Sequence, residues 1–342
     1  MGLVVAVTGP TGTFGFGLVP LLEADERVDR IVGIARRPFD PAAHGWRRMD
    51  YRRGDVRDPA SLEAAFAGAD VVVHLAFIIT GATSGATARE INVEGTLNAV
   101  RAAAAAGATR FVYASSVAAY GFHEDNPVGM TEQWPTRPAD HLFYAQEKAE
   151  LEELLVAEVA RHPGLALYLP RPPIVVGPHT VGAKAQVPGA LAPLAPLARR
   201  AGGLLGRRRL PLPVPVPVPD IPMQFVHEED VGRALLQCIV AAGPPGAYNI
   251  AADDVLRAPE VVRELGFLPV PVPAQLARTP ARALAALASL PFSPPATAWA
   301  EALAHPAVMD TTKAKRDLGW APRHTALASL RATLPRNRDP QG

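Results

Sequence analysis

The chain has 342 residues, of which 49% are hydrophobic and 20% are charged, and its formal net charge is +1. This composition excludes an intrinsically disordered chain, and the small net charge excludes a broad electrostatic attraction to nucleic acid. Because no apolar run approaches the ~20 residues of a membrane span and the N-terminus lacks the basic and long apolar segments of a signal peptide, we expect a cytoplasmic protein without a membrane partner.

Short apolar runs alternate with helical patterns over the first half of the chain. The apolar runs predict buried strands over 3–7, 30–35, 70–77, 110–115 and 165–170. The segments between them predict helices over 14–24, 59–67, 87–106 and 141–160. Strands that are apolar throughout and separated by helices are typical of a sheet covered on both faces, so the predicted fold is α/β with a doubly wound parallel sheet.

A glycine-rich turn follows the first strand in "VAVTGPTGTFGFGLV" and opens the first helix. Gly9, Gly12 and Gly15 have the spacing of a turn that lets the backbone approach a pyrophosphate at a helix N-terminus. The strand–turn–helix context favours dinucleotide binding over the alternative, a glycine turn without a ligand. The residues expected to contact the cofactor here are Gly9, Thr11, Gly12, Thr13, Phe14 and Gly15.

The second strand ends in "GIARRP", where a dinucleotide site often carries an acid for the ribose 2′-hydroxyl. Arg36 and Arg37 stand there instead, and two guanidinium groups suit a 2′-phosphate, which favours NADP over NAD. The alternative is a solvated pair in a loop. After the third strand, in "GDVRD", we expect Asp55 to accept a hydrogen bond from the adenine amino group and Val56 to pack on the ring.

The segment 141–155, "HLFYAQEKAELEELL", places Tyr144 and Lys148 four residues apart, on one face of a helix. A nearby ammonium group and the positive nicotinamide of an oxidised cofactor would together stabilise a phenolate and lower the pKa of the phenol from its usual ~10. The pair is therefore a candidate acid–base device, and the alternative is two solvated surface residues.

The composition changes after Pro178. Residues 187–222 are too rich in proline for a central strand or a long helix and predict an irregular, partly polyproline II segment. A strand and a capped helix are predicted over 224–242, a short strand over 247–251, and a proline- and alanine-rich helical region over 259–305. The predicted division is a nucleotide-binding domain of residues 1–177 plus about 224–250, and a smaller, discontinuous substrate-binding region of 178–223 and 251–335.

These segments together resemble the extended short-chain dehydrogenase/reductase family, the group with NAD-dependent epimerases and dehydratases. Beside the glycine turn, the resemblance rests on "GDVRD", "VVHLAF", "NVEGTLNAV", "FVYASSVAAYG", "YAQEK", "RPPIVVGP", "QFVHEEDVGRAL" and "KAKRDLGWAPR", in the family's order over nearly the whole chain. It implies a Rossmann sheet and a Ser–Tyr–Lys site. It also implies a homodimer through the helices 87–106 and 141–160.

The resemblance assigns the site residues as follows. Ser116 would orient the substrate oxygen, Tyr144 would donate or accept the proton, and Lys148 would bond the nicotinamide ribose. Asn92 would hold a proton-relay water. The remaining cofactor contacts that the resemblance implies are Leu75, Ala76, Ser115 and Arg171, and the remaining substrate contacts are Tyr120 and Ile174.

The chain departs from the sugar-nucleotide members of this family at two places. Ile174 stands where they carry an asparagine, and Met223 and Gln224 stand before "FVH" where they often carry an arginine. Losing these contacts to a diphosphate favours a less polar substrate. We therefore expect an NADP-preferring oxidoreductase that transfers hydride between nicotinamide and a carbonyl or secondary alcohol. The alternatives are a sugar-nucleotide epimerase or dehydratase with a transient keto intermediate, and a non-catalytic dinucleotide sensor or scaffold.

Other polar residues have simpler interpretations. The single cysteine, Cys238, excludes an intramolecular disulfide, and no cluster has the spacing of metal ligands, so no metal is expected. His74, at the end of the fourth predicted strand, is interpreted as a packed core histidine. His227 and Asp230 are interpreted as strand-end and helix-cap residues.

Overall fold

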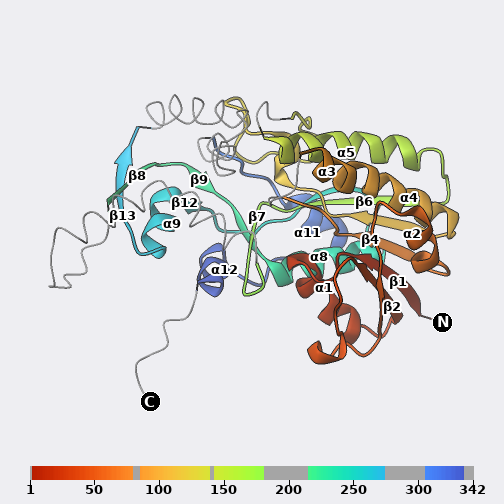
Figure 1. Cartoon of the computed structure of the whole chain (residues 1–342). Helices are drawn as coiled ribbons and strands as arrows, with labels where there is room; N and C mark the ends of the chain where they lie inside the picture. Colours follow the sequence, from red (N-terminus) through yellow and green to blue (C-terminus); the bar gives the residue numbers. More distant parts are fainter. Residues whose placement is uncertain (1, 80–84, 139–141, 181–214, 274–304, 335–342) are drawn as a thin grey trace, which may run out of the picture.

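The computed structural model describes residues 2–79, 85–138, 142–180, 215–273 and 305–334. Its centre is a seven-stranded sheet of order β11-β6-β5-β4-β1-β2-β3, in which all neighbouring strands are parallel (Figure 1). The strands are β1 (Leu3–Thr8), β2 (Val28–Ala35), β3 (Met49–Arg53), β4 (Val71–His74), β5 (Arg110–Tyr113), β6 (Ala166–Arg171) and β11 (Gly246–Asn249). The predicted doubly wound Rossmann sheet is confirmed.

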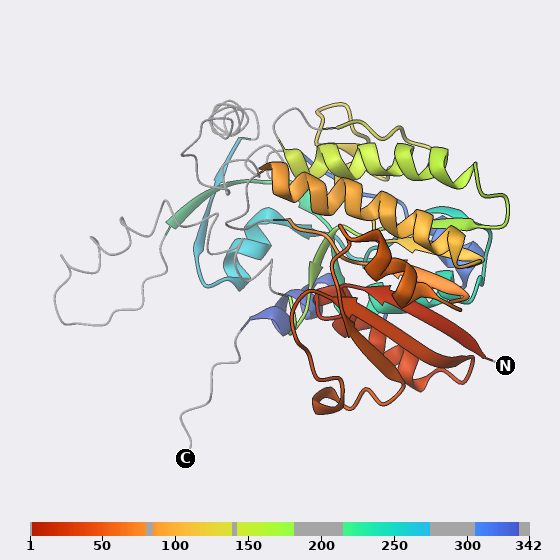
Figure 2. The same ribbon diagram turned by 45° about the vertical axis from the view of Figure 1, so that its right-hand side comes forward.

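Helices cover both faces of this sheet because successive strand residues point to opposite sides. Val5 and Val7 of β1 pack in one apolar cluster with α1 (Thr13–Ala24) and α8 (Glu228–Ile239). Ala6 packs in the opposite cluster with three helices, which Figure 2 shows as a layer across the sheet. These are α2 (Pro59–Phe66), α4 (Gly95–Ala105) and α5 (Phe143–Val159).

The helices α1 and α8 approach each other closely at two glycines. A Cβ on Gly17 would lie 2.1 Å from the carbonyl oxygen of Glu228, and a Cβ on Gly232 would lie 2.1 Å from that of Gly17. Only glycine leaves room for this backbone contact. The crossing fixes α8 beside the helix that follows the glycine-rich turn.

The helix predicted over 87–106 is not uniform. It begins as α3 (Gly85–Arg89), widens into a π-helical turn over Glu90–Glu94, and continues as α4. Single π-helical turns inside α-helices occur frequently at functional sites. This one carries Asn92, one of the predicted site residues.

Beyond β6 the described residues form three small strand pairs. β7 (Ile174–Val176) is parallel to β10 (Phe225–His227), and β9 (Pro222–Met223) is antiparallel to β12 (Leu256–Arg257). β8 (Pro215–Pro219) is parallel to β13 (Leu268–Val272), and α9 (Ala258–Glu264) lies next to this pair. The described part of the chain contains no helix long and apolar enough to cross a membrane.

Two predictions for this region were partly wrong. The end of the predicted irregular segment 187–222 forms β8, because Val216 and Val218 between the prolines keep the N–H groups that one ladder of a two-stranded ribbon needs. Within the predicted helical region 259–305, residues 268–272 form strand β13 instead. Residues 181–214 and 274–304 lie outside the described part.

The C-terminal helices attach to different parts of the fold. α11 (Thr312–Leu318) carries Ala314 and Leu318 into the apolar cluster of the sheet, together with Trp320. α12 (Ala326–Thr333) packs on β7 and β10. The predicted domain boundaries remain predictions. Trp320 belongs by sequence to the predicted substrate-binding region, but it packs in the apolar cluster of the nucleotide-binding sheet.

Candidate active site

Three neighbouring strands end at the same edge of the sheet and place their following loops side by side. β5, β4 and β1 are adjacent, and they lead into Ala114–Ser116, Leu75–Phe77 and the glycine-rich turn. The crevice at the carboxyl ends of parallel strands is the usual ligand position in open α/β sheets.

The glycine-rich turn has the geometry that a pyrophosphate needs. Gly9 has a φ of +67°, and a Cβ there would lie 2.9 Å from the backbone nitrogen of Ala76. A Cβ on Gly15 would lie 1.9 Å from the carbonyl oxygen of Pro10. Gly12 is the N-cap of α1 and supplies no side-chain cap, so the first N–H groups of the helix are available to an anion.

Beneath the turn lies His74, which is 1% exposed and confirmed as a core histidine. Its Nδ1 lies 2.9 Å from the Thr8 hydroxyl and its Nε2 lies 3.0 Å from the Thr96 hydroxyl. Thr8 Oγ1 also accepts from the N–H groups of Leu75 and Ala76 and so donates to Nδ1, which places the ring proton on Nε2. Burial lowers the pKa of His74 to about 3, so the ring stays neutral.

The structure brings Ser116 and Tyr144 together. Ser116 follows β5 as the N-cap of a short 3₁₀ turn, is 5% exposed, and hydrogen-bonds the phenol of Tyr144 at the start of α5. Burial raises the pKa of Tyr144 to about 12, and the Ser116 hydrogen bond opposes that shift. In the protein alone burial therefore outweighs the other effects on this pKa, and the expected lowering by Lys148 together with a bound nicotinamide remains a prediction.

Lys148 is the third member of this group and is 3% exposed. Its Nζ donates to the carbonyl oxygen of Ala114 at 2.7 Å and to the hydroxyl of Tyr113 at 2.9 Å. Nζ lies 5.8 Å from the ring centroid of Tyr144 and 3.8 Å from that of Phe77. Burial lowers the pKa of Lys148 to about 7.

The ring of Phe77 contacts both Tyr144 and Lys148, and the sequence did not predict this contact. Its ring meets that of Tyr144 edge-on, with centroids 5.6 Å apart and planes at 89°. The ring also covers the Lys148 ammonium, a cation–π arrangement. The residue follows the predicted cofactor contacts Leu75 and Ala76, but its type carries no signal for this contact.

Asn92 lies on the π-helical turn and is completely buried. Its amide accepts from the N–H of Ile78 at 2.8 Å, donates to the carbonyl oxygen of Ile78 at 2.9 Å, and donates to the carboxylate of Glu147 at 2.7 Å. These bonds fasten the loop after β4 to α5. The predicted proton-relay water at Asn92 remains a prediction.

Ser115, Arg171 and Tyr120 are buried with protein partners. The Ser115 hydroxyl donates to Glu152 at 2.5 Å, and Arg171 Nε donates to the same carboxylate at 2.8 Å. Arg171 Nη1 lies 2.7 Å from the Tyr120 hydroxyl, which in turn lies 2.8 Å from Asn249 Oδ1. A cofactor or substrate could contact these side chains only if they gave up some of these hydrogen bonds. The predicted contacts therefore remain predictions.

The predicted adenosine end of the site lies at the ends of β2 and β3. Arg36 and Arg37 are exposed directly after β2. Asp55 is half-buried and paired with Arg57, whose Nη2 lies 2.7 Å from its carboxylate and holds its pKa below the ordinary value. An adenine amino group would therefore share the Asp55 carboxylate with Arg57. Val56 is buried beside α4.

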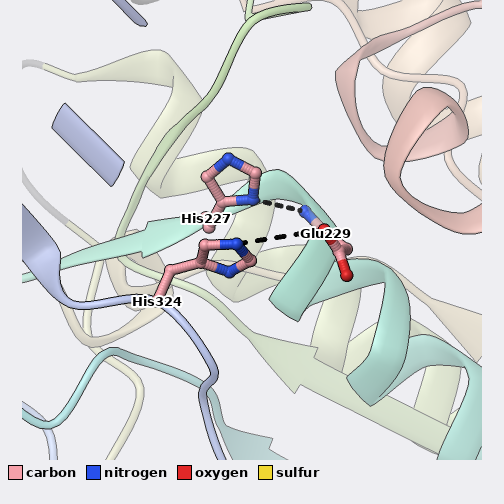
Figure 3. A group of neighbouring side chains, drawn as sticks. All are labelled: His227, Glu229 and His324. Atoms are coloured by element: carbon pink, nitrogen blue, oxygen red, sulfur yellow. Dashed lines mark hydrogen bonds and ion pairs between the residues drawn. The ribbon is translucent and has the colours of Figure 1, made fainter. Parts of the chain in front are cut away.

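A second cluster of potential ligands lies at the start of α8, where ligand atoms of His227, Glu229 and His324 come within 4.8 Å of one another (Figure 3). The two imidazole rings stack 4.1 Å apart, so their in-plane lone pairs do not converge on one point. His227 Nδ1 accepts from the N–H of Glu229 as the N-cap of α8, which leaves its proton on Nε2. The hydrogen bonds therefore assign His227 the structural role predicted for it.

Asp230 was expected to cap the helix α8, but the N-cap residue of α8 is His227. Its buried carboxylate accepts from the N–H groups of Arg323 and His324 at 2.9 and 3.0 Å. The indole of Trp320 donates to its carbonyl oxygen at 2.9 Å. Asp230 therefore anchors the C-terminal segment to α8.

Comparison with known sequences identifies the family of the chain. A model described as the NAD dependent epimerase/dehydratase family matches residues 5–251. The uncharacterized protein Rv0501 of Mycobacterium tuberculosis is 28% identical over 336 residues, which cover 96% of this chain and 82% of that protein. Sterol demethylase protein B of Methylococcus capsulatus is 32% identical over 179 residues, which cover 52% of each chain.

Solved structures share the fold. MoeE5, solved in complex with UDP-glucuronic acid and NAD, aligns with a TM-score of 0.68 at 22% identity over 96% of each chain. A short-chain dehydrogenase/reductase superfamily protein from Agrobacterium tumefaciens, solved with bound NAD, gives 0.67 at 21% identity, also over 96% of each chain.

A seven-stranded Rossmann sheet with a glycine-rich first turn and an additional C-terminal region is the architecture of the extended short-chain dehydrogenases/reductases. Within that class, the chain belongs to the NAD dependent epimerase/dehydratase family, whose model covers more than half of it.

Proposed function

We propose that the protein is an NAD(P)-dependent oxidoreductase that transfers hydride between nicotinamide and a carbonyl compound or secondary alcohol. The observation that carries this proposal is the convergence of Ser116, Tyr144 and Lys148 at the strand ends next to the glycine-rich turn. A bound nicotinamide would supply the hydride.

Each of the three side chains has its own role in the proposed reaction. Ser116 orients the substrate oxygen and stabilises the charge that develops on it. Tyr144 delivers or accepts the proton at that oxygen. With a pKa of about 12 in the protein alone, Tyr144 needs a positive charge nearby to ionise at neutral pH, and Lys148 provides one while it is protonated.

The residues around β7 and β10 support a less polar substrate. Ile174 stands at the position where sugar-nucleotide members of the family carry an asparagine, and its side chain is 38% exposed. Gln224 is buried, and its amide exchanges two hydrogen bonds with the backbone of Met309 at 2.8 and 2.9 Å, so it is already paired within the protein. The name of the related sterol demethylase protein B also supports an apolar substrate.

A second candidate is epimerisation or dehydration of a sugar nucleotide. Family membership and the UDP-glucuronic acid in the MoeE5 structure favour it. Cofactor consumption separates the two, because a reductase consumes reduced cofactor stoichiometrically and an epimerase turns over without net change. The third alternative, a non-catalytic sensor, would bind the cofactor without turnover.

The test is a panel of ketones, aldehydes and UDP- and dTDP-sugars, assayed with NADH and NADPH by absorbance and product chromatography. We expect net oxidation of reduced cofactor with an apolar carbonyl compound. Turnover of a sugar nucleotide without net oxidation would replace this proposal with the second candidate.

We propose NADP as the preferred cofactor because Arg36 and Arg37 are exposed at the end of β2, although the structural neighbours hold NAD. The double variant Arg36→Ala/Arg37→Ala should weaken NADP⁺ binding by about tenfold or more, as expected for loss of a charged contact, and leave NAD⁺ binding unchanged. Calorimetric titration measures both, and equal affinities before and after the substitutions would reject NADP preference.

We also propose the homodimer through the segments 87–106 and 141–160. Val156 on α5 is 58% exposed, so an apolar side chain is available on this surface. Light scattering coupled to gel filtration should give twice the 36.1 kDa of one chain, and a monomeric mass would contradict the proposal.

A further inference from the structure

Four charged side chains are buried together behind Tyr144. The exposed fractions of Lys148, Glu152, Arg171 and Glu147 are 3%, 4%, 5% and 6%. Two are acids and two are bases, so the group is neutral overall only while Lys148 is protonated. Removing one partner from such a group leaves an uncompensated buried charge.

Glu152 bonds directly to one member of this group, Arg171. It lies one helical turn after Lys148 on the same face of α5. Its carboxylate accepts from Ser115 at 2.5 Å and from Arg171 through both Nε, at 2.8 Å, and Nη2. These bonds fasten α5 to the ends of β5 and β6, beside the residues that form the proposed site.

The surroundings of Lys148 leave few groups that can stabilise its charge. The titratable groups besides Glu152 that face it are His74 on β4, Tyr113 on β5, and Glu147 and Tyr144 on α5. His74 is neutral, and burial raises the pKa of both phenols, so these three bring no negative charge. Glu152 has the larger effect of the two carboxylates that oppose the lowering of the Lys148 pKa by burial. The hydrogen bonds from Arg171 fix the position of the Glu152 carboxylate.

We infer that Glu152 is a positioning residue of the Ser116–Tyr144–Lys148 site, which holds Lys148 in its charged form and fixes the strand end that carries Ser115 and Ser116. The inference rests on the proposed function for its catalytic meaning. It explains why a buried acid follows the Tyr–Lys pair at helical spacing. It also accounts for the buried Arg171, whose guanidinium hydrogen-bonds the Glu152 carboxylate and holds it in place.

The lysine content of the chain allows a direct test. The sequence has four lysines, Lys148, Lys184, Lys313 and Lys315, so a full-length protein labelled with [¹³Cε]lysine gives few signals, and Lys148→Arg identifies that of Lys148. In the wild-type protein this signal should titrate near pH 7. In Glu152→Gln we expect the midpoint to fall by about one pH unit, because the amide keeps the size but not the charge.

Two further variants separate charge from packing. Glu153→Gln, an exposed neighbour on α5, should leave the midpoint unchanged, and Glu152→Asp should largely retain it because the charge stays. Equal midpoints in the wild type and Glu152→Gln, or equal shifts in Glu152→Asp and Glu152→Gln, would overturn the inference.

A substitution at Glu152 leaves Arg171 without its acid and can prevent folding. The double variant Glu152→Gln/Arg171→Gln removes both charges and leaves two amides that can bond each other. We expect its Lys148 midpoint to fall as well, and a wild-type midpoint in the folded double variant would overturn the inference.

The titration uses neither cofactor nor substrate, so it is independent of the panel that tests the proposed function. If the Lys148 signal responds to Glu152→Gln and the panel shows no turnover, the inference about Lys148 is supported and the proposed function fails. If the panel shows turnover and the signal does not respond, the inference alone fails.

Discussion

Lys148 combines two properties that conflict in an ordinary protein interior. Its ammonium is almost completely buried, yet two acidic residues and two oxygen acceptors surround it. Burial lowers its pKa from 10.5 to about 7, so the side chain is poised to change charge near neutral pH. In the proposed function Tyr144 is the proton donor, and we expect its proton transfer to respond to the charge of Lys148.

The pKa of Lys148 predicts a pH-dependent stability. Because its pKa is lower in the folded than in the unfolded protein, the unfolded chain binds more protons between about pH 7 and 10.5, and stability rises with pH across that window. The contribution is about 1.4 kcal/mol per pKa unit. The unfolding free energy of the wild type should therefore rise relative to that of Lys148→Met over this range, as chemical denaturation measures.

The exposed Lys315, which pairs with Asp253 at the surface, provides the matched control for that series. Lys315→Met should follow the wild type at every pH. A parallel course of the wild type and Lys148→Met between pH 7 and 10.5 would show that Lys148 is not perturbed in the folded protein.

At the residue scale, local spacing in the sequence indicated which side chains would lie close together. The four-residue spacing of Tyr144 and Lys148 and the position of Ser116 after a strand were visible in the sequence, and the structure brings the three together. The raised pKa of Tyr144 was not visible, because it depends on burial by distant segments. Phe77 reaches the site only through tertiary packing.

At the scale of elements, the contact between α1 and α8 holds the glycine-rich turn in place. The two helices come from distant parts of the chain, since α1 follows β1 and α8 precedes β11, and their backbones touch at Gly17 and Gly232. Periodicity predicted both helices. It could not predict the crossing, because a glycine inside a helix has many possible reasons. The π-helical turn around Asn92 and the strand β13 were missed for a related cause, since tertiary pairing overrides local preference.

Gly17→Val tests the helix crossing. Its Cβ would overlap the carbonyl oxygen of Glu228 and force α1 and α8 apart, at a cost of about 1–3 kcal/mol. We expect a lower melting temperature and weaker dinucleotide binding, measured by calorimetry. Gly164→Ala is the control, because a Cβ there meets nothing within 4 Å. Equal melting temperatures of the two variants would contradict the close crossing.

At the scale of the whole molecule, a small number of buried polar groups connect distant parts of the chain. Asp230 on α8 is completely buried and bonds the backbone of residues 323–324, and α11 and Trp320 close the same side of the sheet. The doubly wound sheet was predictable from alternating apolar strands and helices. The return of residues 309–320 to that sheet was not, because the sequence pattern does not show which core a short helix joins.

Asp230→Ala tests this anchor. The substitution leaves the N–H groups of Arg323 and His324 without their acceptor, and each unpaired group costs about 1–3 kcal/mol. We expect faster tryptic cleavage of the C-terminal segment and a lower melting temperature. Gln237→Ala, at a partly exposed position of the same helix, should change neither. Unaltered cleavage in Asp230→Ala would show that the segment is held by other contacts.

The proposed function depends on Tyr144 as the proton donor beside a bound nicotinamide. The most direct measurement compares wild type and Tyr144→Phe for steady-state oxidation of NADPH with the carbonyl compound that the panel identifies, together with the Kd for NADP⁺. We expect the rate to fall by about 10²-fold or more, as for loss of a general acid, with the Kd nearly unchanged. A Tyr144→Phe enzyme that keeps its rate would contradict the account.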